Sequence, residues 1–166
     1  MPKPKQLLRA PQPQQRIYDT LLPPPIETLT VAYLTPLLGG LRVVTRLPPM
    51  GPGEETLPAD TFIRVEASTG YPVDGILYNM QAIIHSYAPY NDEVTAEANI
   101  GLALAWMGNA QGTTITANNY EWFVTWSMVA VTGRRINETM TSLSRYTGAA
   151  QWRLTGQPIA PPGEYP

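Results

Sequence analysis

The chain has 166 residues and a mass of 18.3 kDa, which is enough for one domain with its own hydrophobic core, and its formal net charge is -2. The absence of cysteine and the single histidine exclude a disulfide framework, a thiolate nucleophile and metal sites built from cysteines or from several histidines. The charge balance excludes a globally basic surface for nucleic acid, and no apolar run approaches the ~18 residues that would indicate a membrane span.

Charged residues are scarce in this chain. They make up 14% of it, against about 25% in a typical soluble domain. A monomer needs surface charge for solubility, whereas the buried cores of protein interfaces are depleted in charge. We therefore interpret the low charge as an indication that much of the surface contacts other protein.

Proline marks both ends of the chain and one internal loop. Seven of the 18 prolines lie in the first 25 residues, four in residues 48–58 and four in the last nine residues. Because proline fixes φ and removes a backbone donor, it is typical of extended segments and turns. The pattern predicts an extended N-terminal arm over residues 1–16, a single domain over 17–157 and a C-terminal tail over 158–166.

The N-terminal arm lacks periodic apolar positions and is locally basic, with Lys3, Lys5, Arg9 and Arg16. Three interpretations stay open: a solvated tail, an arm that lies across a neighbouring subunit, or a segment that contacts nucleic acid through its cations. In the second interpretation the candidate subunit-contact residues are Leu7, Leu8, Arg9 and Ile17.

The first predicted element is a helix over residues 26–38. Three prolines precede it, which suits a helix start, and Gly39 and Gly40 suit a helix stop. A short strand over 41–47 follows, and then the proline loop.

Two further strands are predicted over residues 60–68 and 76–87, with a turn at 69–74 between them. Alternation on the first of these strands divides its side chains between two faces. Ile63, Val65 and Ala67 share one face, and Phe62, Arg64 and Glu66 share the other. We expect the two strands to form a long hairpin.

The main helix is predicted over residues 91–108, with Asn91 or Asp92 as its cap and Gly108 or Asn109 at its end. Helical spacing predicts one core-facing stripe. This stripe consists of Val94, Ala98, Gly101, Leu102 and Ala105. Its small residues would let the helix lie close to a sheet.

Two closing strands are predicted over residues 121–132 and 145–155, joined by a polar loop at 133–144 that carries Arg134 and Arg135. On the last strand two sets of side chains alternate. Tyr146, Trp152 and Leu154 share one face, and Arg145, Thr147, Gln151, Arg153 and Thr155 share the other.

The strands come in runs and do not alternate with helices. This order favours an α+β fold, in which a mixed or antiparallel sheet of about five strands has two helices packed on one face.

No pattern of residues indicates catalysis. His85 has no carboxylate at strand spacing, and the adjacent Ser86 points to the opposite face of the strand. The carboxylates form no pair in contrasting environments, and the phosphate-binding and nucleophile motifs are absent. We therefore expect no enzyme activity, no cofactor and no metal, and we interpret His85 as a strand histidine at a surface or an interface.

Two groups of residues have both a functional and a structural interpretation. Trp122, Trp126 and Trp152 either belong to the core or line a ligand pocket beneath a curved sheet. Arg134 and Arg135 either lie in a solvated loop or contact an acidic partner or DNA, as a candidate lumen or partner-contact loop.

A series of segments resembles a known family. A helix ending in LTPLLGG leads into LRVVTRLP, and after the proline loop come FIRVEAS and ILYNMQAIIHSYAP, which runs into the alanine-rich EVTAEANIGLALA. Over residues 26–157 this arrangement resembles the tail terminator proteins of long-tailed bacteriophages (siphoviruses), especially those that infect actinobacteria. The long arm before Ile17 and the polar segment at 133–144 depart from the family pattern, so no lumen or contact residue is carried over.

The resemblance implies a virion protein that assembles into a hexameric ring at the head-proximal end of the tail, after synthesis in the host cytoplasm. Such a ring caps the tail tube, stops its polymerisation and presents a surface to the head-to-tail connector, while DNA passes through the lumen without specific binding. The implied partners are further copies of the chain, the tail tube protein and the connector or stopper protein, with no membrane.

Other functions stay open on the sequence alone. One is another neck component, either a head-to-tail stopper or a tail tube subunit. A second is a soluble α+β domain that binds a small ligand through its tryptophans, and a third is a nucleic-acid-binding module that uses the N-terminal arm.

Overall fold

The computed structural model describes residues 21–48, 60–137 and 143–158. Within these residues two helices and eight strands follow one another. In chain order they are β1 (Leu21–Leu22), α1 (Ile26–Leu34), β2 (Arg42–Val44), β3 (Phe62–Asp74), β4 (Leu77–Pro89), α2 (Glu93–Gly108), β5 (Thr114–Ala117), β6 (Tyr120–Ile136), β7 (Leu143–Thr155) and β8 (Gln157–Pro158). The predicted arm and nearly all of the predicted tail lie outside the described residues.

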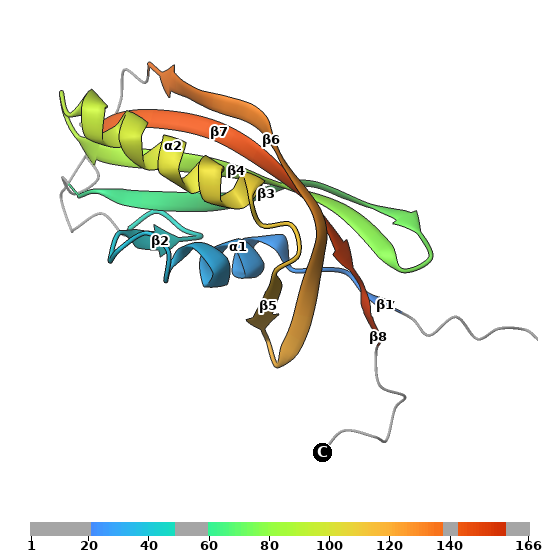
Figure 1. Ribbon diagram of the computed structural model, residues 1–166. Helices are drawn as coiled ribbons and strands as arrows, with labels where there is room; N and C mark the ends of the chain where they lie inside the picture. The colour runs from blue at the N-terminus through green and yellow to red at the C-terminus, as the bar shows by residue number, and fades with distance from the viewer. Residues whose placement is uncertain (1–20, 49–59, 138–142, 159–166) are drawn as a thin grey trace, which may run out of the picture.

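Six strands form a curved sheet in the order β2-β3-β4-β7-β6-β5, and both helices lie on one face of it (Figure 1). β2 runs parallel to β3, and the other neighbouring strands are antiparallel. The predicted α+β class is therefore confirmed, with six strands in place of about five. The extra strand is the short edge strand β5, while β1 and β8 pair separately and bring Leu21 beside Pro158.

Helix α1 is shorter than the predicted range of 26–38. It ends at Leu34, because Pro36 has no N–H with which to continue the hydrogen-bond ladder. The amides of Leu37 and Leu38 both donate to the carbonyl of Leu34. Gly39 and Gly40 then turn the chain with φ of 61° and 93°, but they lie beyond the end of the helix, so the predicted glycine stop is wrong.

The β3–β4 hairpin is confirmed, but it is longer than predicted. The predicted turn at residues 69–74 is wrong, since these residues continue β3 and the chain reverses after Asp74. Register shifts between Ala67 and Gly70 and between Pro72 and Asp74 accommodate the glycine and the proline without ending the strand. The hairpin consequently extends beyond the helices at one end of the molecule (Figure 1).

The N-terminus of α2 is capped by Asp92, whose side chain accepts a hydrogen bond from the amide of Thr95 at 3.2 Å. We expect Asp92→Ala to lower the free energy of unfolding by about 1 kcal/mol, because an amide of the first turn loses its acceptor. Denaturant titration followed by circular dichroism measures this loss. Asp92→Asn retains an acceptor and should lose less; equal losses in the two variants would contradict a capping role.

The face of α2 that packs on the sheet differs from the prediction. The predicted stripe points outward, with Val94 80% and Leu102 47% exposed. The buried residues lie on the opposite face and are Ala96, Ile100, Ala103, Leu104 and Met107. Close packing depends on glycines of the sheet, since a Cβ at Gly133 would lie 2.8 Å from Ile100 and one at Gly148 2.6 Å from Leu104. We call the exposed set, Val94, Ala98, Gly101, Leu102 and Ala105, the outer stripe of α2.

The predicted polar loop at 133–144 is also corrected. Strand β6 continues to Ile136, and β7 begins at Leu143, so Arg134 and Arg135 lie in a strand. Arg134 is aligned with Thr147 of β7 and Arg135 with Tyr146. Because successive strand residues point to opposite faces, the two arginines lie on different sides of the sheet.

The core lies between the sheet and the two helices. Trp122 and Trp152 are fully buried there, together with apolar residues from both helices. The indole N–H of Trp152 donates to the carbonyl of Met107 at 2.8 Å, which ties β7 to the last turn of α2. Phe62 and Tyr87 stack with ring centroids 4.6 Å apart in a second, smaller cluster with Leu143.

Candidate functional site

Among the described residues no helix covers the second face of the sheet, which we call the open sheet face. Its side chains are the alternate residues of β3, β4, β7 and β6 that point away from the helices. They include Arg64, Glu66, Gln81, Ile83, His85, Arg145, Thr147, Ala149, Gln151, Arg153, Met128, Val131 and Arg134. The predicted division of side chains between the faces of β3 and of β7 is confirmed.

A polar cluster surrounds His85 on this face. The Arg145 guanidinium donates to His85 Nδ1 at 3.2 Å, and His85 Nε2 lies 3.4 Å from Glu66 Oε2. Arg64 also pairs with Glu66, at 3.0 Å. Since Arg145 only donates, His85 Nδ1 must accept, and the Nε2–H then faces the carboxylate. The arrangement fits a neutral imidazole held between a cation and an anion.

Burial lowers the pKa of His85 from its ordinary value of 6.5, and the nearby Arg145 charge lowers it further, while Glu66 opposes both. The unfolded chain therefore takes up this proton at a higher pH than the folded one, and protonation favours unfolding. Stability from this group is fully present above pH 6.5 and is lost as the pH falls from there toward the lowered pKa.

We therefore expect the free energy of unfolding to fall more steeply with acidification in the natural protein than in His85→Gln. Urea titrations between about pH 7.5 and pH 5 measure the two slopes, and subtraction removes the contribution of the carboxylates that both proteins share. Equal slopes would contradict a buried neutral histidine.

A shallow hollow of about 310 Å³ lies beside this cluster on the open sheet face. Ile83, Val131 and Ala149 form apolar parts of its lining, and Arg134 and Arg145 lie at its polar side. Arg64 does not line the hollow; it lies opposite the lining residue His85 on the neighbouring strand, where it pairs with Glu66. The hollow therefore combines apolar side chains with polar ones and with two arginines.

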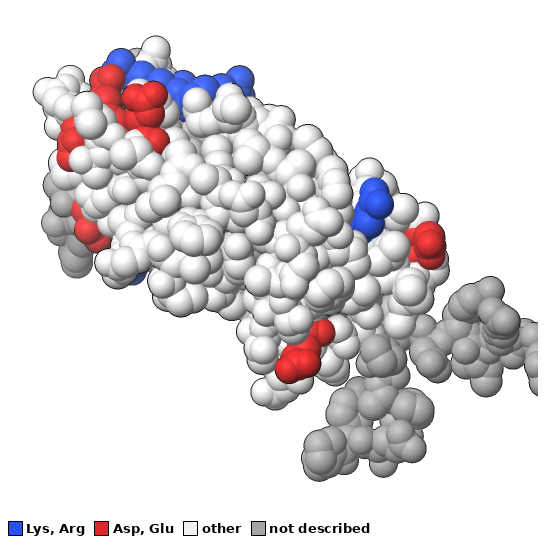
Figure 2. Space-filling view, viewed as in Figure 1, with Lys and Arg blue, Asp and Glu red and all other residues white. Residues whose placement is uncertain are grey.

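The helix side of the subunit carries little charge over most of its surface (Figure 2). Figure 2 shows the surface over most of α2 free of charge, with acidic and basic atoms gathered over its N-terminal end. Glu93 pairs there with Arg135, and Glu97 is exposed one turn further along the helix. Between these acids and the exposed Trp106, the outer stripe of α2 presents small and apolar side chains.

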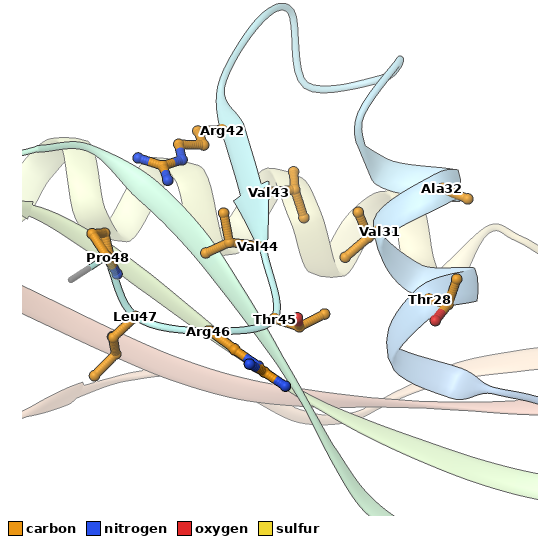
Figure 3. Close-up of a pocket in the computed structure, with 10 residues that line it drawn as sticks. All are labelled: Thr28, Val31, Ala32, Arg42, Val43, Val44, Thr45, Arg46, Leu47 and Pro48. Atoms are coloured by element: carbon orange, nitrogen blue, oxygen red, sulfur yellow. The ribbon is translucent and has the colours of Figure 1, made fainter.

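Two further apolar features lie at the surface. A groove of about 690 Å³ separates α1 from β2, and Val31 and Val43 point toward each other across it (Figure 3). It ends at Pro48, beyond which residues 49–59 lie outside the described part of the chain. At the other end of the molecule the hairpin exposes Tyr71, Val73 and Ile76 by 53%, 43% and 58%.

The predicted site residues have different outcomes. Leu7, Leu8, Arg9 and Ile17 lie outside the described residues. Arg134 lies on the open sheet face and Arg135 binds Glu93 on the helix side, so the two do not form one contact loop.

The tryptophans do not form a common surface either. Trp122 and Trp152 are core residues, while Trp126 lies on the open sheet face. The Arg153 guanidinium lies over the Trp126 ring, with its Cζ 5.6 Å from the ring centroid. This removes the ligand pocket predicted from these three residues. Sequence reasoning missed Glu66 as the neighbour of His85, because the two are brought together only by the pairing of β3 with β4.

Comparisons with known proteins give a partial likeness. No protein-family model matches the chain, and no curated protein does. Among solved structures, a chain from the virion of a native gene transfer agent particle is similar, with a TM-score of 0.48 and 17% identity over 79% of this chain and 91% of that one. A second solved chain, whose name describes no function, has a TM-score of 0.47 and 11% identity over 82% of this chain and 95% of that one. We therefore argue function from the surfaces of the subunit.

The described residues contain neither a membrane-spanning helix nor a cluster of metal ligands. None of the helices there is long and apolar enough to cross a bilayer. No group of three or more His, Asp or Glu side chains in these parts of the chain could hold a metal ion.

Proposed function

We propose that this protein is a virion structural protein, and more specifically a tail terminator. In this role it forms a hexameric ring that caps the tail tube, stops its polymerisation and offers a surface for joining the head. Its partners are further copies of itself, the tail tube protein and a head-to-tail connector protein, and DNA passes through the ring without specific binding. The role is one of assembly and needs no catalysis, cofactor or membrane.

The observation that carries this proposal is that, among the described residues, two different faces of the subunit expose apolar side chains. The outer stripe of α2 and the open sheet face both expose apolar side chains, among them Val94 at 80% and Val131 at 42%. Exposed apolar patches of this kind are typical of protein contacts. Two different faces on one subunit suit a heterologous contact, which closes into a ring when the rotation allows.

The resemblance of residues 26–157 to tail terminators selects the kind of ring. One similar chain is described as part of a gene transfer agent virion, which is also a virion assembly. A low charge content also suits a subunit that is enclosed by other proteins.

The mass of the purified full-length protein tests self-association. Light scattering should give about six times the subunit mass of 18.3 kDa. A monomer at all accessible concentrations would contradict the proposal.

Addition of the protein to a polymerising tail tube protein tests the terminator role. A terminator should bind tube ends, stop growth and appear as a ring at one end in electron micrographs. Incorporation along the tube would indicate a tube subunit. Binding of a head connector without any effect on tube growth would indicate a stopper.

A further inference from the structure

We propose that the outer stripe of α2 in one subunit packs on the open sheet face of the next copy of this chain. This inference rests on the proposed self-association and says which two surfaces form the contact. In the assembled state α2 would then lie between two sheets, its own and that of its neighbour. Each sheet would be covered by helices on both faces.

The shapes and side chains of the two surfaces suit such a contact. The outer stripe has Ala98, Gly101 and Ala105 along its middle, so the helix backbone can approach a partner closely. Val94 projects from the first turn of α2 and is 80% exposed, and Leu102 and Trp106 continue the exposed apolar surface along the helix. The apolar hollow beside Val131 on the open sheet face offers a site for an apolar side chain of this size.

The charges on the two surfaces favour a second copy of this chain as the partner. Arg134 and Arg145 line the hollow, while Glu97 is exposed at the edge of the outer stripe. No partner for Glu97 occurs in the described part of its own subunit. Acidic helix and basic sheet face are therefore complementary within a single sequence, and complementary charges favour one orientation of docking.

The acids of α2 and the arginines of the open sheet face also lie at the same end of the subunit. Glu93 at the start of α2 pairs with Arg135, and Arg134, the preceding residue, lies on the open sheet face. The acids and the open-face arginines are thus on opposite sides of one end of the subunit. When the helix side of one copy packs on the open sheet face of the next, the acids of the first copy meet the arginines of the second. This contact needs no large shift along the strands.

Cysteine pairs provide a direct test, because the natural chain has no cysteine. Ala98→Cys lies on the outer stripe and Val131→Cys on the open sheet face, separated within one subunit by the helix and the sheet. The full-length double variant, treated with a short bifunctional maleimide, should give a ladder of covalent oligomers on a denaturing gel. Each single variant carries a cysteine on one of the two faces and should give no ladder.

Charge reversal tests the orientation. We expect Glu97→Lys and Arg134→Glu each to raise the concentration needed for assembly by about tenfold, and the combined variant to regain assembly. Glu121→Lys, which makes the same charge change at the opposite end of β6 from Arg134 and far along the strand from the hollow, should assemble like the natural protein.

The outcomes separate this inference from the proposed function. A natural protein that assembles, with no ladder from the double cysteine variant and with unchanged assembly of both charge variants, would overturn the α2–sheet contact and leave the ring intact. A natural protein that stays monomeric would overturn both. A ladder together with charge rescue supports both.

Discussion

Trp152→Ala is expected to lower the free energy of unfolding by about 3–5 kcal/mol, the usual loss for a large aromatic residue removed from a core. Trp152 is fully buried, and its ring meets that of Tyr33 edge to face with centroids 5.4 Å apart. Its N–H also donates to the carbonyl of Met107. The substitution therefore leaves a cavity where α1, α2 and β7 meet.

Two variants calibrate this result. Trp152→Phe keeps most of the apolar contact and loses a hydrogen bond worth about 1 kcal/mol, so it should lose much less stability. Trp126→Ala removes a half-buried tryptophan from the open sheet face and should also lose less. Denaturant titrations at one fixed protein concentration measure all three, since assembly itself adds stability. A loss for Trp126→Ala as large as that for Trp152→Ala would contradict the assignment of the two rings to different sides of the sheet.

Gly148→Ala is expected to destabilise the fold by about 1–3 kcal/mol through overpacking. A Cβ at this position would lie 2.6 Å from the Leu104 side chain and 2.9 Å from the backbone oxygen of Val131. The leucine side chain can shift, but the oxygen belongs to the backbone of β6. Close contact between α2 and the sheet consequently depends on this glycine.

The same substitution at Gly101 provides a matched control. Gly101 lies on the outer stripe, and a Cβ there would meet nothing within 4 Å. Since alanine favours the helix over glycine, Gly101→Ala should stabilise the subunit by about 0.5–1 kcal/mol. Thermal unfolding at a protein concentration too low for self-association should therefore shift in opposite directions for the two variants. A shift in the same direction would show that α2 faces the sheet with its other side.

Local chemistry allowed much of the fold to be predicted. Period-two alternation grouped Ile63 with Val65 on one face of β3, and Trp152 with Leu154 on one face of β7. The structure confirms both groupings and shows that each of these faces is the core side. Gly39 and Gly40 predicted a turn after the first helical segment, and the structure has this turn, with positive φ at both glycines.

The buried face of α2 could not be predicted from its sequence. After the first turn the helix carries a single charged residue, Glu97, and both of its faces are small or apolar. Helical periodicity assigns a core face only when one side is polar, so the choice depended on packing. Gly133 and Gly148, two sheet residues distant in sequence, make room for Ile100 and Leu104 and thereby decide which face is buried.

The sequence by itself determined the α+β class, the order of the main elements and a charge content suited to extensive contact with protein. Composition and short-range periodicity carry this information, because they depend on each residue and its near neighbours. Only the tertiary structure decided that α2 turns its outer stripe to the surface and that Arg134 and Arg135 lie on opposite sides of a strand. It also decided that His85 meets Glu66 and Arg145. These features depend on strand register and on contacts between distant segments, which local patterns do not specify.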